Sequence, residues 1–181
     1  IYDPILKGNL RIVFYHISEL AMILYSGANI TKSSFRKTII IYIASIVEAI
    51  LLFLLKEKNC NNKIEIKKDN WIYENVKKIY KLDDEQDVIG AIRRKNIETK
   101  SCDKLNFDEI NKACLRQKII SKNVFGKADK IRKMRNGLHI GGLQEIQKDY
   151  SNADLDIAFD AMNEVIILAQ KIKNDNLKHS R

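Results

Sequence analysis

The chain has 181 residues, of which 45% are hydrophobic, and this supplies enough apolar material for one domain with its own core. A single proline and seven glycines leave few breakers between short strands, which argues against a sandwich or a barrel and favours helices. The 32 Lys and Arg against 23 Asp and Glu give a net charge of +9, which suits polyanionic partners, although an evenly spread lysine-rich surface explains it equally well. The three cysteines, Cys60, Cys102 and Cys114, contain no CxxC pair, so they argue against a disulfide framework or a zinc site and indicate a reducing compartment.

Two long helices are predicted in the first third of the chain. Asp3 caps the first helix and Pro4 takes its first helical position, after which apolar residues recur at helical spacing. Ser33 or Ser34 caps the second helix, which covers residues 35–58 and is apolar on nearly every face. A helix of that composition is predicted to be the buried centre of a bundle.

The apolar segment 38–55 approaches the length of a membrane span, so a transmembrane helix is the alternative. Glu48 lies near its middle, where a carboxylate in a lone span costs roughly 2.5 to 3.5 kcal/mol. Basic residues also flank both ends without the asymmetry that orients a span. We therefore predict a buried helix and no membrane partner.

The middle of the chain is predicted as short elements. Alternation in residues 63–68 allows a short strand, but no second strand is evident, so an extended connector is predicted. One short helix is predicted to begin at Asp69 or Asn70, and another is predicted from Asp84 through Ile97, followed by a polar loop. The apolar residues of the first of these helices are Trp71, Ile72, Val76 and Ile79.

Three further helices are predicted in the last part of the chain. Asn106 with Glu109, and Ser151 with Asp154, are capping pairs that open two of them. A helix with a basic motif and the last long helix together occupy residues 125–173. Six or seven helices then form an all-α antiparallel bundle with short inserted helices, and the whole chain, 1–181, is predicted to be one domain.

The segment that could carry chemistry is the basic motif. Positions three, four and seven apart share one face of a helix, so Arg132, Arg135 and His139 form a polar stripe at the edge of the buried face. Further candidates are Asn136 as a catalytic residue and Lys130 and Lys133 as substrate-binding residues.

Two arginines and one histidine have the chemistry for phosphodiester cleavage without a metal. Imidazole exchanges protons near neutral pH, and guanidinium groups hold a phosphate and stabilise its growing charge. A homodimer that faces two such stripes would supply the second acid–base group. The competing interpretation is structural, with the arginines paired to acidic residues and His139 favoured by the dipole at the end of its helix.

The segment Lys130-Ile-Arg-Lys-Met-Arg-Asn-Gly-Leu-His-Ile140, followed by a loop and a long amphipathic helix, resembles the signature of HEPN (higher eukaryote and prokaryote nucleotide-binding) domains. In that family an Arg and a His separated by four to six residues form a metal-independent ribonuclease site at a dimer interface. The segment 37–55, with Glu48, is similar to the family's early core helix, which often carries an acidic residue.

Two departures from the family pattern concern the arginine. Arg135 is followed by an asparagine, as in the family, but only three residues separate it from His139. Arg132 has six residues before His139 but is followed by Lys133, so either arginine matches the family's position. Gly141 stands where the family's toxins often have a tyrosine, and the resemblance therefore does not imply regulation by adenylylation.

The resemblance implies a metal-independent RNA endonuclease of a toxin–antitoxin or antiviral defence system, with His139, Arg135, Arg132 and Asn136 as its catalytic residues. It implies a cytoplasmic homodimer that acts on single-stranded RNA, with an antitoxin or regulatory protein as a further partner and no metal or organic cofactor. The alternative is a non-catalytic HEPN-like module that binds a nucleotide, RNA or a protein. Glu48 either supports the site or pairs with an arginine in the core, and its apolar surroundings favour the pairing.

Overall fold

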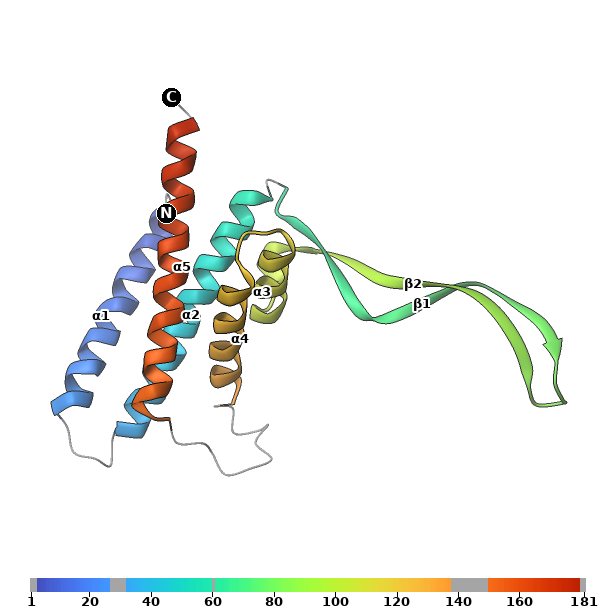
Figure 1. Cartoon of the computed structure of the whole chain (residues 1–181), viewed down its shortest axis with the longest axis horizontal. Coiled ribbons are helices and arrows are strands. Elements are labelled where there is room, and N and C mark those ends of the chain that lie inside the picture. The colour runs from blue at the N-terminus through green and yellow to red at the C-terminus, as the bar shows by residue number, and fades with distance from the viewer. Residues whose placement is uncertain (1–2, 27–31, 60, 138–149, 180–181) are drawn as a thin grey trace.

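The structure, a computed structural model, describes residues 3–26, 32–59, 61–137 and 150–179. Its helices are α1 (Pro4–Ser26), α2 (Lys32–Lys58), α3 (Phe107–Arg116), α4 (Lys122–Asn136) and α5 (Asn152–His179), and its strands are β1 (Lys63–Lys81) and β2 (Asp87–Ser101). A single 3-10 turn, η2 (Cys102–Lys104), joins β2 to α3. The helices form a bundle, and the two strands project from it as a long hairpin (Figure 1).

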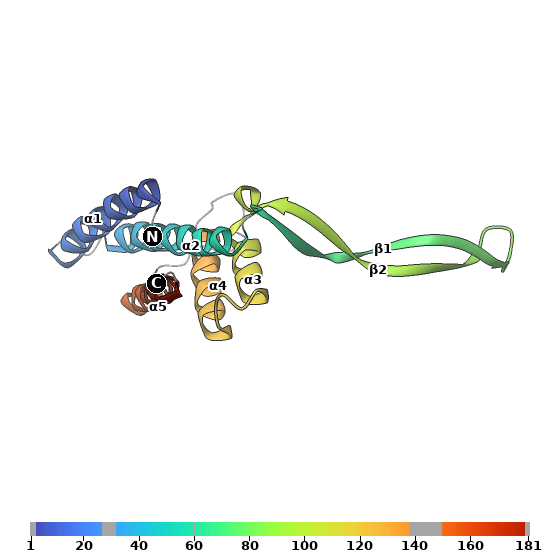
Figure 2. The same ribbon diagram turned by 90° about the horizontal axis from the view of Figure 1, so that it is seen from above.

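Helix α2 is the centre of the bundle. It packs against α1, α3, α4 and α5, and Figure 2 shows α1 on one side of α2 and α4 and α5 on the other. Its buried side chains, among them Ile39, Ile43, Ala44, Val47 and Leu51, lie on one broad side of the helix. Helix α2 thus contacts four other helices, while Ile41 and Ser45 on its remaining side are exposed.

The same helix bears on the membrane alternative. Residues Ser34–Lys58 are long and apolar enough to cross a membrane by length and composition. However, 56% of the most apolar window lies buried inside the protein, as in the core helix of a soluble bundle. The other helices thus cover more than half of this apolar window.

The prediction of an all-α fold is wrong, because β1 and β2 form a two-stranded antiparallel sheet. The two short helices predicted from Asp69 or Asn70 and from Asp84 through Ile97 are strands, and the polar loop predicted after them is the end of β2 and the turn η2. The strand interpretation of residues 63–68, which was set aside, is the one that the structure shows. The fold is a helical bundle with a β-hairpin, and the hairpin with its turn is called the arm below.

Bulges explain why the arm was missed in the sequence. The ladder is interrupted by register shifts at three places along β1, residues 67–71, 74–77 and 78–80. Asn75 lies in one of them with a φ of 52°, a left-handed conformation that asparagine tolerates better than most residues. Each shift breaks the period-two alternation of a strand, and the remaining apolar spacing imitates a helix.

The root of the arm is fixed to the bundle, whereas its outer part is not. Ile64 and Ile66 are buried in the core. Lys100 of β2 forms an ion pair with Glu109 of α3, with Nζ and Oε1 2.7 Å apart. At the far end the backbone N–H of Leu82 donates to the carbonyl of Gln86 at 2.9 Å, which closes a five-residue turn.

The helix starts were predicted well, because caps are local. The Asp3 carboxylate accepts hydrogen bonds from the first turn of α1, and Asn106 and Glu109 form a reciprocal capping box on α3. Ser151 and Asp154 cap α5 in the same way. Two helices begin earlier than predicted: α2 at Lys32 instead of after Ser33 or Ser34, and α4 at Lys122, capped by Ser121, instead of at residue 125.

Candidate functional site on helix α4

Helix α4 carries the basic motif and is locked in place by its inner face. The Ser121 hydroxyl caps the helix by accepting a hydrogen bond from the backbone N–H of Val124. Ala128, Ile131 and Met134 are buried against α2, α3 and α5. The arginines that follow these residues by one position therefore stand at the edge of the core, as the helical spacing predicted.

Arg132 lies in an acidic cluster on the α3 side of the helix. Its Nε and Nη2 donate to Oδ1 of Asp129 at 2.9 and 2.6 Å, and Asp108 of α3 lies 3.5 Å away. Burial alone would raise the pKa of Asp129, but hydrogen bonds from Lys133 and Arg132 outweigh burial and hold that pKa below its usual value. This carboxylate is therefore ionised at neutral pH and neutralises Arg132.

Arg135 lies on the other side of the same edge and reaches α2. Its Nη1 donates to Oε2 of Glu48, and the two side chains are 25% and 27% exposed. The guanidinium carbon also lies 5.3 Å from the ring centre of Phe107, the first residue of α3. The pairing of Glu48 with an arginine, which its apolar surroundings favoured, is observed, and the partner is Arg135.

The end of α4 is tied to the start of α5. The hydroxyl of the buried Tyr150 donates to the carbonyl of Met134 at 2.8 Å, and Arg36 of α2 donates to the carbonyl of Tyr150 at 3.2 Å. These bonds hold together the two ends between which the chain passes through residues 138–149. His139, the predicted acid–base residue, and Gly141 belong to that segment and lie outside the described residues.

The remaining predicted site residues differ in their partners and in their exposure to solvent. Arg132 and Arg135 share one edge of α4 but bind different carboxylates, whereas Asn136 and Lys130 are exposed to solvent. Lys133 is mostly exposed and is paired with Asp129 at 2.8 Å. Sequence reasoning missed Asp129, although its spacing of three residues from Arg132 and four from Lys133 is typical of helical ion pairs.

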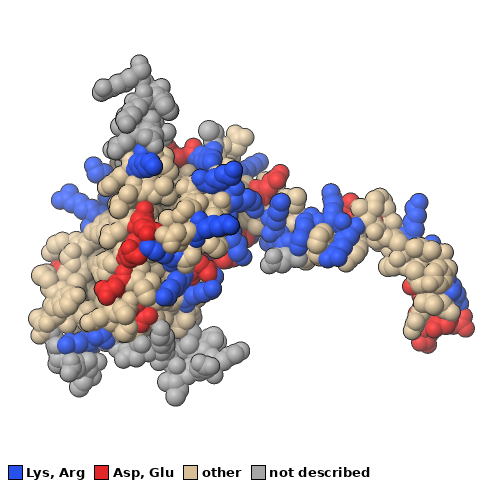
Figure 3. All heavy atoms as spheres, in the orientation of Figure 1, with Lys and Arg blue, Asp and Glu red and all other residues tan. Residues whose placement is uncertain are grey.

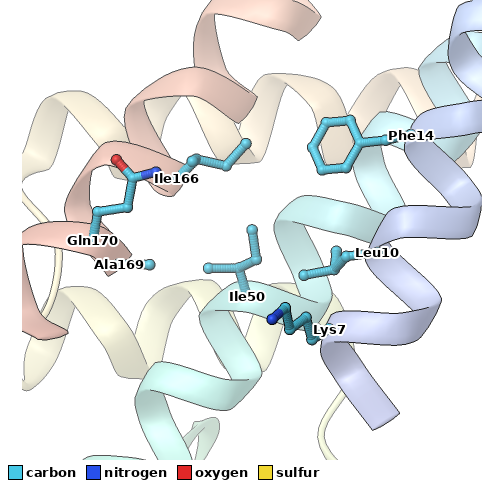
Figure 4. A pocket seen from close by; sticks show the side chains of 7 residues that line it. All are labelled: Lys7, Leu10, Phe14, Ile50, Ile166, Ala169 and Gln170. Atoms are coloured by element: carbon cyan, nitrogen blue, oxygen red, sulfur yellow. The ribbon is translucent and has the colours of Figure 1, made fainter. Parts of the chain in front are cut away.

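A second candidate is a cavity of about 360 Å³ between α1, α2 and α5 (Figure 4). Its walls are Leu10, Phe14, Ile50, Ile166 and Ala169, with the amine of Lys7 and the amide of Gln170 at its rim. No carboxylate or imidazole lines it, so the cavity lacks the paired groups that acid–base catalysis uses.

Neither a metal cluster nor a second histidine joins the α4 site within the part of the chain described here. No three side chains of His, Cys, Asp or Glu converge there in a way that could hold a metal ion. His16 of α1 stacks on Tyr42 of α2 with ring centres 6.2 Å apart.

Comparison of the chain with protein-family models, with curated proteins and with solved structures finds no match. The functional argument therefore depends on the side chains themselves.

Proposed function

We propose that the chain is a metal-independent RNA endonuclease of a toxin–antitoxin or antiviral defence system. The observation that supports this proposal is the contact between Arg135 and Glu48. The HEPN resemblance singled out both residues separately, although they are 87 positions apart in the chain. Their contact fixes an arginine at the end of α4, four positions before His139 in the chain.

Each residue has a distinct role in the proposed reaction. His139 accepts the proton of a ribose 2′-hydroxyl, the 2′-oxygen attacks the adjacent phosphorus, and the bond to the 5′-oxygen breaks. A second histidine from the partner of a homodimer donates a proton to that leaving oxygen. The products are a 2′,3′-cyclic phosphate and a 5′-hydroxyl end, and no metal takes part.

The charges on α4 favour Arg135 over Arg132 as the phosphate ligand. Arg132, 18% exposed, lies between two carboxylates, Asp129 of its own helix and Asp108 of α3, which hold it against the helices. Arg135 shares its charge with Glu48 and stays partly exposed at the end of the helix. In this proposal Arg132 positions α4, while Arg135 binds the scissile phosphate and stabilises its charge.

The test is cleavage of a labelled single-stranded RNA by the purified chain in EDTA, with analysis of the product ends. Wild-type protein is expected to leave 2′,3′-cyclic phosphate ends, and His139→Ala is expected to abolish cleavage. His16→Ala is the matched control, because His16 lies on α1 against Tyr42, and it is expected to cut normally. Unchanged cutting by a folded His139→Ala protein would contradict the proposal.

A second candidate is favoured by the neutralised arginines, since each already has a carboxylate partner. We propose as this alternative a non-catalytic HEPN-like module that binds a nucleotide, RNA or a protein. It predicts binding that weakens with salt, no cleaved product, and full binding after His139→Ala.

The proposed setting of the endonuclease is the cytoplasm, where RNA is available and thiols stay reduced. Cys102 and Cys114 are free and buried, which fits that setting. An antitoxin or regulatory protein is the proposed partner that restrains cleavage.

A further inference from the structure

One face of the arm gathers aromatic rings and cations. In the register of the hairpin Trp71 pairs with Lys95 and Tyr73 pairs with Arg93. Residues two apart on one strand point to the same side, so these four side chains share one face, on which Lys67 lies further toward the root. This set is called the tryptophan face.

Contacts within the tryptophan face hold a ring and two cations together. The guanidinium carbon of Arg93 lies 3.8 Å from the ring centre of Trp71, and the amine of Lys95 lies 4.3 Å from it. Trp71 is 39% exposed and Tyr73 is 59% exposed. The guanidinium of Arg93 on the indole of Trp71 and the exposed ring of Tyr73 are therefore planar groups that solvent can reach.

Charge is distributed unevenly along the arm. The two strands contain ten Lys and Arg against five Asp and Glu, whereas the turn from Leu82 to Gln86 contains three acidic residues and no basic one. Figure 3 shows Lys and Arg gathered on the part of the arm near the bundle and acidic residues at its tip. The inner part of the arm is therefore the basic part.

The neighbouring arginines Arg93 and Arg94 lie on opposite faces of the arm and have different partners. On the opposite face Arg94 forms an ion pair with Glu74, and Lys100 is paired with Glu109 at the root. On the tryptophan face Arg93 stacks on a ring. Arg93 is also exposed, so a phosphate could reach its guanidinium.

We propose that the tryptophan face binds single-stranded nucleic acid. Bases stack on Tyr73 and on the Arg93 guanidinium that covers Trp71, and the phosphates bind Lys67 and Lys95. Tyr73 lies two residues beyond Trp71, about 7 Å along the strand, so each platform can take a separate base. A duplex keeps its bases stacked on one another and cannot use these platforms.

A nucleic acid fits this face better than a protein partner does. The centres of protein interfaces are depleted in lysine, because its amine is costly to strip of water. The tryptophan face combines lysines with rings that accept any base, as in grooves that bind single strands. The site lies on the arm, apart from α4, and goes beyond the proposed cleavage chemistry.

Trp71 is the only tryptophan of the chain, so its fluorescence reports on this face directly. The full-length protein is titrated with uridine oligomers of about 20 nucleotides, long enough for one such site, that carry 2′-O-methyl groups and so resist cleavage. Quenching with a salt-dependent affinity is expected. Oligothymidine of the same length is expected to bind similarly, because stacking does not read the 2′ position, and a duplex is expected to bind weakly.

Matched variants distinguish the effect of stacking on affinity from the effects of overall charge and of misfolding. Tyr73→Ala and Arg93→Ala are each expected to weaken binding about 5-fold or more, since one stacked base contributes roughly 1 to 3 kcal/mol. Tyr73→Phe keeps the ring and is expected to bind as wild type does. Tyr80→Ala and Arg94→Ala remove the same groups from the opposite face and are expected to change affinity less than about 2-fold.

Two results would overturn this inference. One is equal affinity of the Tyr73→Ala, Arg93→Ala and wild-type proteins for the oligomers. The other is an absence of binding together with self-association, measured by light scattering, that Tyr73→Ala disrupts, since the face would then bind a second copy. His139→Ala should leave the quenching intact, so failure of the proposed cleavage and failure of this site are distinguishable.

Discussion

The contact between Arg135 and Glu48 gives the sharpest prediction about stability. It joins the end of α4 to the middle of α2, and each side chain is about three-quarters buried, at 25% and 27% exposed. Replacing Glu48 by alanine leaves the guanidinium in that partly buried position without its carboxylate. Replacing Arg135 leaves the carboxylate unpaired and also removes the cation from the ring of Phe107.

The magnitude follows from the degree of burial. Exposed ion pairs contribute about 0 to 1 kcal/mol, whereas breaking a fully buried pair costs about 3 to 5 kcal/mol. For a pair with a quarter of its surface exposed we expect Glu48→Ala to lower the free energy of unfolding by about 1 to 2 kcal/mol. In a chain of this size the loss corresponds to a fall in Tm of roughly 2 to 8 °C.

The assay is a double-mutant cycle measured by urea unfolding and circular dichroism. Glu48→Ala, Arg135→Ala and the double variant are compared, and the double variant is expected to lose about 1 kcal/mol less than the sum of the single losses. The same cycle on Lys81 and Asp84, an exposed pair between the end of β1 and the turn of the arm, is the control and should show almost no coupling. Additive losses for Glu48 and Arg135 would refute the role given to this contact.

Three further results are expected. The folded-state pKa of Asp129 is low because hydrogen bonds, first from Lys133, outweigh its burial. The stabilisation from this carboxylate is therefore present above its unfolded pKa of about 3.9 and is lost as pH falls through the folded pKa. Measured by urea unfolding, the free energy of unfolding of the Asp129→Asn protein should fall less steeply below about pH 4 than that of the wild type. Burial raises the pKa of Cys114 to about 12, so mass spectrometry after thiol labelling at neutral pH should find this site modified only in denaturant. Ile43→Ala, at a fully buried position, should cost about 2 to 5 kcal/mol in thermal unfolding, and the control Ile41→Ala, 39% exposed, should cost less than about 1 kcal/mol.

Helix starts and the buried centre could be read directly from the sequence. A capping box such as Asn106 with Glu109 involves residues three apart, so the signal and the structure that it forms are both local. Residues 35–58 are apolar on nearly every side, a pattern that predicts a helix at the centre of a bundle, and α2 packs against four other helices. For the candidate site, the edge position of Arg132 and Arg135 also followed from helical spacing alone.

The partners of these arginines were only partly predictable. Asp129 lies on the same helix as Arg132 and could have been found by its spacing of three residues. Glu48 was expected to pair with an arginine, but which arginine depends on how α4 crosses α2. That crossing is set by the packing of many apolar side chains, which no local pattern encodes.

The sequence by itself determined the five helices that the structure shows and the caps of α1, α3 and α5, because these depend on residues close together in the chain. Tertiary structure decided the conformation of the arm. The apolar residues of 63–101 fit a helix or a bulged strand equally well, and the pairing of β1 with β2 selects the strand. It also decided which distant residues meet: Asp108 of α3 comes within 3.5 Å of Arg132, and the cross-strand register brings the Arg93 guanidinium to 3.8 Å from the ring centre of Trp71. Strand pairing and helix crossing join residues far apart in the chain, and for that reason they emerge only when the whole chain has folded.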